Sequence, residues 1–60
     1  MDTETRDAIR EARKKYMRAM GFYQYKLWLS SIGMKLSDQE FIDRAENAKE
    51  EAAKWLEAQK

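Results

Sequence analysis

The sequence predicts an all-α fold, an antiparallel two-helix hairpin over residues 3–32 and 38–58 within a single domain of residues 1–60. The chain has no proline and only two glycines, and most positions hold residues that favour a helix. Between the two helices lies a short segment with the signals of a helix end and a new helix start. A short connection makes consecutive helices antiparallel neighbours, which predicts the hairpin.

The connection between the helices carries three independent signals. Gly33 is suited to the left-handed conformation that often follows a helix. Ser37 and Glu40 have the spacing of a capping box at the start of the second helix. Leu36 and Phe41 are placed to form a hydrophobic staple across that start. For the first helix, an N-terminal cap is expected at residue 2 or 3.

Each predicted helix has one apolar face at helical spacing, and these two faces are expected to pack together. On the first helix the face consists of Ile9, Ala12, Tyr16, Met20, Tyr23 and Leu27. On the second helix it consists of Phe41, Ala45, Ala48, Ala52 and Trp55. Bulky side chains on the first face then fill the shallow groove above the alanines of the second.

The first helix has a second apolar stripe, which a single neighbouring helix cannot cover. We expect it to form a protein interface at Met17, Gly21, Phe22, Tyr25, Trp28, Leu29 and Ile32. Exposed apolar surface of this kind marks interaction sites, and Trp and Tyr are enriched among binding hot spots. The stripe is expected to be covered by a second copy, giving a homodimeric four-helix bundle, or by another protein. Gly21 permits either a close approach of that partner or a kink.

The net charge of +1 conceals a difference between the two halves of the chain. Residues 1–35 carry a net charge of +4 and residues 36–60 a net charge of −3, which favours pairing of the two helices. Nucleic-acid binding is the alternative function, with possible phosphate contacts from Arg6, Arg10, Arg13, Lys14 and Arg18. Because Asp7 and Glu11 interrupt this basic run, a solvated charged face is the competing interpretation.

The residue types needed for most catalytic and metal sites are missing. The chain has no Cys and no His, so a disulfide framework, the usual zinc ligands and the commonest general base are excluded. Asp43, Glu46, Glu50 and Glu57 line one side of the second helix, away from its apolar face, and are expected to be solvated. We therefore expect neither enzymatic activity nor a metal or cofactor.

The sequence thus favours a small protein-binding module that acts as a regulator, an inhibitor or an assembly subunit. No apolar run approaches the length of a membrane span or a signal peptide, and a cytoplasmic location is expected. A third possibility is an amphipathic helix that lies on a membrane surface, with Tyr25 and Trp28 at the headgroup level. The capped second helix favours a packed domain instead.

Overall fold

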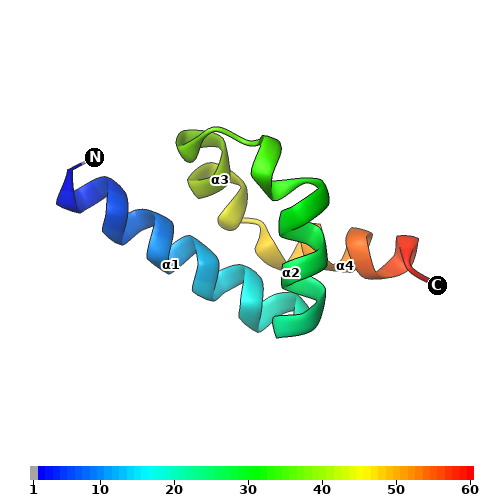
Figure 1. The fold of residues 1–60 in the computed structure, drawn as a ribbon. Coiled ribbons are helices and arrows are strands. Elements are labelled where there is room, and N and C mark those ends of the chain that lie inside the picture. Colours follow the sequence, from blue (N-terminus) through cyan, green and yellow to red (C-terminus); the bar gives the residue numbers. More distant parts are fainter. Residues whose placement is uncertain (1) are drawn as a thin grey trace.

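In the computed structural model, which describes residues 2–60, the chain is entirely helical apart from short connections (Figure 1). The elements are α1 (Thr3–Met20), α2 (Phe22–Ser31), the 3-10 turn η1 (Gly33–Lys35), α3 (Asp38–Ala45) and α4 (Ala48–Ala58). The all-α class is confirmed for these residues. The two predicted helices are not continuous, because each is divided into two.

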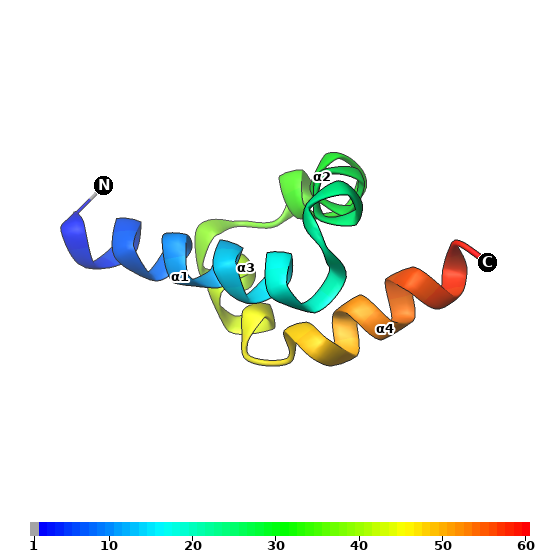
Figure 2. The same ribbon diagram turned by 90° about the horizontal axis from the view of Figure 1, so that it is seen from below.

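The helices form an elongated body of 39 × 19 × 17 Å. In Figure 2, α2 is seen nearly end-on while α1 is seen from the side. Helix α2 therefore crosses α1 at a steep angle and does not continue it. Helices α3 and α4 run alongside α1 in the same direction, and α4 extends to the C-terminus beyond the other elements (Figures 1 and 2). The antiparallel packing predicted for the two halves of the chain is therefore not found. A single chain therefore builds a core from α1, α2, α3 and α4.

The first helix is interrupted at Gly21, which has φ 88° and ψ 156°. This region of backbone conformation is open almost only to glycine. The Gly21 N–H still donates to the Met17 carbonyl, and the Tyr25 N–H donates to the Gly21 carbonyl, both at 2.8 Å. A Cβ at position 21 would have no neighbour within 4 Å. Gly21 is therefore required by its backbone angles and not by packing, and it forms a sharp bend.

The second predicted helix is interrupted at Glu46 and Asn47. Asn47 has φ −113° and ψ 35°, so the helix axis changes direction without a left-handed residue. The Asn47 N–H donates to the Arg44 carbonyl at 3.0 Å. Across the break, the Arg44 guanidinium lies 3.3 Å from the Glu51 carboxylate. No sequence signal predicted this interruption.

The capping predictions are confirmed, but the prediction for Gly33 is wrong. The Asp2 carboxylate accepts from the Thr5 N–H at 2.7 Å, and the Ser37 hydroxyl accepts from the Glu40 N–H at 3.2 Å. Gly33 does not adopt a positive φ, because the chain passes into the turn η1 instead of a left-handed cap. It is a glycine for steric reasons: a Cβ there would lie 2.9 Å from the Trp28 ring.

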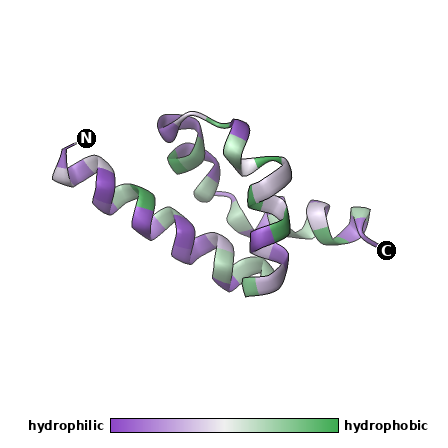
Figure 3. Cartoon of the chain, in the orientation of Figure 1, coloured by the Kyte–Doolittle hydropathy of each residue, from purple (hydrophilic) through white to green (hydrophobic). Residues whose placement is uncertain are grey.

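The core is built around an aromatic cluster. Tyr16 and Trp28 are 0 % exposed, and their rings stack at a centroid distance of 4.3 Å. The Phe41 ring lies 5.3 Å from Tyr16 and 6.0 Å from Trp28. The other buried side chains are Ala12, Met20, Tyr25, Ala45, Ala48 and Ala52. Hydrophilic and hydrophobic positions alternate along α1, as expected for a helix with one buried face (Figure 3).

The bend at Gly21 reverses which face of the following helix is buried. Up to Met20 the predicted inner face is confirmed, since Ala12, Tyr16 and Met20 are buried. Beyond the bend, Tyr23 and Leu27 were expected inside, but they are 70 % and 40 % exposed. In a continuous helix these two side chains would follow Tyr16 and Met20 along one face. The change of direction at Gly21 turns the opposite face of α2 toward the core.

Substitution of Gly33 by alanine is expected to destabilise the fold. The new Cβ would lie 2.7 Å from Leu29 Cδ1 and 2.9 Å from the fully buried Trp28 ring. We expect Gly33→Ala to lower the free energy of unfolding by about 1–3 kcal/mol, as overpacking does. Denaturant unfolding measures this, with the exposed Ser30→Ala as the control. A Gly33→Ala variant as stable as the wild type would contradict the packing of η1 on Trp28.

Candidate functional site

Four large hydrophobic side chains remain exposed among the described residues, and all of them lie on α2 and η1. Their exposed fractions are 63 % for Phe22, 70 % for Tyr23, 40 % for Leu27 and 74 % for Met34. We call these four residues the α2 surface. Large exposed apolar patches on monomeric proteins often mark binding sites.

Two lysines border the α2 surface. The Lys26 ammonium lies 4.9 Å above the centre of the Phe22 ring, and Lys35 is exposed beside Met34 in η1. Neither lysine takes part in an ion pair with the described residues. No Asp or Glu occurs between Glu11 and Asp38, a stretch that contains six Lys and Arg residues. The surface therefore combines exposed hydrophobic area with unneutralised positive charge.

The helix that carries this surface is anchored from its other side. Tyr25 and Trp28 are buried, and Leu29 and Ile32 pack against the core. The indole N–H of Trp55 in α4 donates to the Gln24 side-chain oxygen at 2.9 Å. This long-range hydrogen bond ties α2 to the C-terminal helix. Because its inner face is held in this way, α2 presents Tyr23 and Leu27 outward in a defined orientation.

The predicted interface is only partly accessible. Phe22 and Gly21 are exposed, and Met17, Leu29 and Ile32 are partly buried. Tyr25 and Trp28 were expected at the centre of this interface, but they are 5 % and 0 % exposed within a single subunit. Their assignment to an exposed face is wrong, because the bend at Gly21 turns them into the core.

Sequence reasoning missed three residues of the α2 surface. Tyr23 and Leu27 were placed on the inner face of a continuous helix, and Met34 was not assigned to any face. The signal that separates the two faces of α2 is Gly21, an unfavourable residue inside a helix. If the helix is broken at this glycine, the side chains after it need not continue the buried face that precedes it.

The structure brings together three of the five possible phosphate contacts. Arg6, Arg10 and Arg13 line a hollow of about 370 Å³ between α1 and the start of α3, together with Ile9 and Asp38. None of the three arginines forms an ion pair with the described residues.

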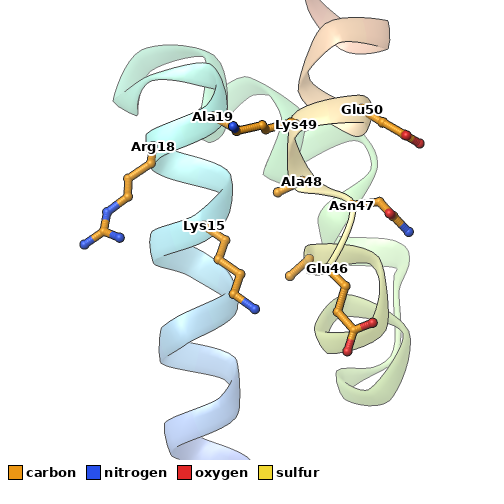
Figure 4. A pocket seen from close by; sticks show the side chains of 9 residues that line it. Lys15, Arg18, Ala19, Glu46, Asn47, Ala48, Lys49 and Glu50 are labelled. Atoms are coloured by element: carbon orange, nitrogen blue, oxygen red, sulfur yellow. The ribbon is translucent and has the colours of Figure 1, made fainter.

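The other two possible phosphate contacts lie apart from this hollow. The Lys14 ammonium is 3.5 Å from the Glu11 carboxylate. Arg18 lines a different hollow of about 440 Å³ between α1 and the α3–α4 junction, whose floor is Ala19, Ala45 and Ala48. In Figure 4 the Lys15 side chain extends across this second hollow toward Glu46, whereas Arg18 points away from it. Since both signs of charge surround the alanines, this hollow favours no class of ligand.

The buried aromatic cluster contains polar atoms that have no hydrogen-bond partner among the described residues. These atoms are the hydroxyl oxygens of Tyr16 and Tyr25 and the indole nitrogen of Trp28. Burial raises the pKa of Tyr16 to about 12, and the Glu51 carboxylate adds to this while Arg44 opposes it. Burial also raises the pKa of Tyr25, opposed by Arg13. Both phenols therefore hold their protons at neutral pH and supply no general base there.

Alkaline pH is expected to destabilise the protein through Tyr16. The phenol ionises near pH 10 in the unfolded chain and only at about pH 12 in the folded protein. The folded state therefore binds more protons than the unfolded state between these values, so the free energy of unfolding falls as pH rises through this range. Below pH 10 this contribution is fully present.

Denaturant unfolding of wild type and Tyr16→Phe at several pH values between 8 and 12 tests this linkage. The variant is expected to lose less stability than the wild type above pH 10, because it lacks the phenol whose ionisation is opposed by burial in the folded state. If the free energy of unfolding depended on pH in the same way in both proteins, Tyr16 would not contribute to the loss of stability at alkaline pH.

The described residues contain no cluster of three or more acidic side chains arranged to hold a metal ion. Among residues 2–60, no helix has both the length and the hydropathy required to cross a bilayer. Comparison with family models, with curated proteins and with solved structures found no match to this chain.

Proposed function

We propose that this chain is a non-enzymatic protein-binding module that docks on a larger protein through the α2 surface. The observation that carries the proposal is the exposure of Phe22, Tyr23, Leu27 and Met34 on α2 and the adjoining turn η1, while the opposite face of α2 is packed against the core. Aromatic side chains on a rigid scaffold bind with a small loss of conformational entropy and are typical binding hot spots. The module acts by occluding or bridging sites on its partner, as a regulator, an inhibitor or an assembly subunit does.

The charges near the α2 surface define the kind of protein that fits it. Lys26 and Lys35 border the apolar side chains, and the nearest acidic residues along the chain are Glu11 and Asp38. Complementary potentials favour association and suppress wrong partners. We therefore expect the partner to offer an apolar groove edged by Asp or Glu. Two copies facing each other through this surface would instead bring lysines together.

Replacement of Tyr23 and Leu27 by serine is expected to abolish partner binding without unfolding the module. Both side chains are exposed, so the double variant loses apolar contact area for a partner but little of the core. Affinity capture from cells that make the protein, followed by titration of the recovered partner, measures the loss. We expect binding to weaken by about 100-fold or more, since two contacts of the hot-spot type are removed.

Two controls make this experiment specific for the α2 surface. The variant Ala53→Ser, Ala58→Ser changes two exposed positions of α4 and is expected to bind like the wild type. A photoreactive phenylalanine analogue at position 23 is expected to cross-link to the partner, whereas the same analogue at position 53 does not. Undiminished binding of the Tyr23, Leu27 variant, with cross-links from position 53, would refute the proposal.

Nucleic-acid binding is the second candidate, and the hollow lined by Arg6, Arg10 and Arg13 favours it. Three guanidinium groups without ion-pair partners are suited to phosphate oxygens. Asp38 lines the same hollow and opposes an anion there. For this reason, and because Lys14 and Arg18 do not join the three arginines, we place this function second.

This second function predicts steep salt dependence. If the three arginines contact phosphates, affinity for mixed duplex DNA falls about 40-fold as salt rises from about 50 to 200 mM. The Arg6→Ala, Arg10→Ala variant removes two of these contacts. The slope of log affinity against log salt concentration is therefore expected to become shallower by about 2. Lys49→Ala, Lys54→Ala removes the same charge from α4 and serves as the control. Absence of any gel shift with RNA and DNA at low salt would exclude this function.

A further inference from the structure

The bend at Gly21 leaves a row of backbone groups without partners. In a continuous helix the N–H groups of Phe22, Tyr23 and Gln24 would donate to the carbonyls four residues earlier. At the bend these three N–H groups make no backbone hydrogen bond with the described residues, and no side chain caps the start of α2. The carbonyls of Arg18, Ala19 and Met20 accept none either. If residue 21 adopted helical torsion angles, these six backbone groups would pair to form three helical hydrogen bonds.

The helical hydrogen bonds on both sides of Gly21 already exist. Gly21 N–H donates to Met17 O and Tyr25 N–H donates to Gly21 O, each at 2.8 Å. Only the torsion angles of residue 21 separate the bent chain from one helix over residues 3–31. Nothing lies within 4 Å of a Cβ at this position, so neighbouring side chains do not lock the bend.

What holds the chain bent is the packing of α1 on the elements that follow it. Tyr16 stacks on Trp28 at 4.3 Å and contacts Phe41 at 5.3 Å, and Ala12 and Met20 are buried in the same core. A single chain that straightened would return Trp28 and Tyr25 to water. A second copy removes this cost, because the α1 of each chain can occupy the same place on the other.

We propose that Gly21 is a hinge through which two copies of this chain exchange α1, giving a dimer in which residues 3–31 form one continuous helix in each copy. Every core contact of the single subunit is then remade between copies, and the three backbone hydrogen bonds are added. Short hinge segments favour such exchange of an element between identical chains. The inference is independent of the proposed function, since all of its contacts lie inside the fold.

Alanine at position 21 is expected to drive the exchange. An L-residue is strained at φ 88° but favours the helix, so Gly21→Ala destabilises the bent subunit and stabilises the straight one. Because each dimer contains two hinges, we expect the dimerisation constant to rise by on the order of 100-fold. The matched control carries D-alanine at position 21, which has the same atoms but favours a positive φ, and is expected to stay monomeric.

Both proteins are within reach of chemical synthesis, and sedimentation equilibrium from micromolar to millimolar concentration measures their association. NMR of a mixture, in which one copy is labelled at Tyr16 and the other at Trp28, distinguishes a dimer that exchanges α1 from a dimer of two intact subunits. We expect ring-to-ring nuclear Overhauser effects between copies in the Gly21→Ala dimer and within one copy in the D-alanine monomer.

Three results would overturn the proposal. The first is a Gly21→Ala protein that stays a folded monomer at millimolar concentration. The second is a dimer in which the Tyr16–Trp28 contact remains within one copy, because the pairing then uses another surface. The third is a Gly21→Ala protein that is unfolded at every concentration, since an accessible exchanged dimer would be recovered by mass action.

Discussion

The positive φ of Gly21 is the constraint on which the rest of this structure depends. A continuous first helix would carry apolar side chains on two faces, and a hairpin of two helices can shelter only one of them. The bend turns α2 across α1, so that Trp28 stacks on Tyr16 and both are fully buried. Glycine adopts this backbone conformation without strain. The bend thus divides a long helix with two apolar faces into two helices that pack around one core.

The aromatic cluster explains how so short a chain builds a core without disulfides or metals. Aromatic side chains bury more area than any others, and their offset stacking adds to the effect of burial. Tyr16, Trp28 and Phe41 come from α1, α2 and α3, so one cluster links three successive α-helices. The cluster also buries two phenol oxygens and an indole nitrogen without hydrogen-bond partners among the described residues, which opposes folding. The fold therefore draws on hydrophobic burial far more than on polar networks.

The same bend that buries one face of α2 exposes the other. Helix α2 is apolar on both sides, because Tyr25 and Trp28 lie inside while Phe22, Tyr23 and Leu27 lie outside. Core packing accounts for the inner set only. The outer set contributes little to the core, and Lys26 lies over the Phe22 ring at its edge. The fold is thus stabilised by one face of this short helix, and the proposed binding uses the other.

The helical class, the caps at Asp2 and Ser37 and the alanine face of the C-terminal half follow from the sequence alone, because propensity, capping and periodicity act over a few neighbouring residues. Local patterns also identified Tyr25 and Trp28 as unusual, but they did not determine which way these side chains point. That depended on the torsion angles of Gly21, since a glycine inside a helix permits either a kinked or a straight chain. Only the tertiary packing of Trp28 against Tyr16 and Phe41 selected the bent chain, because these contacts join residues on different helices.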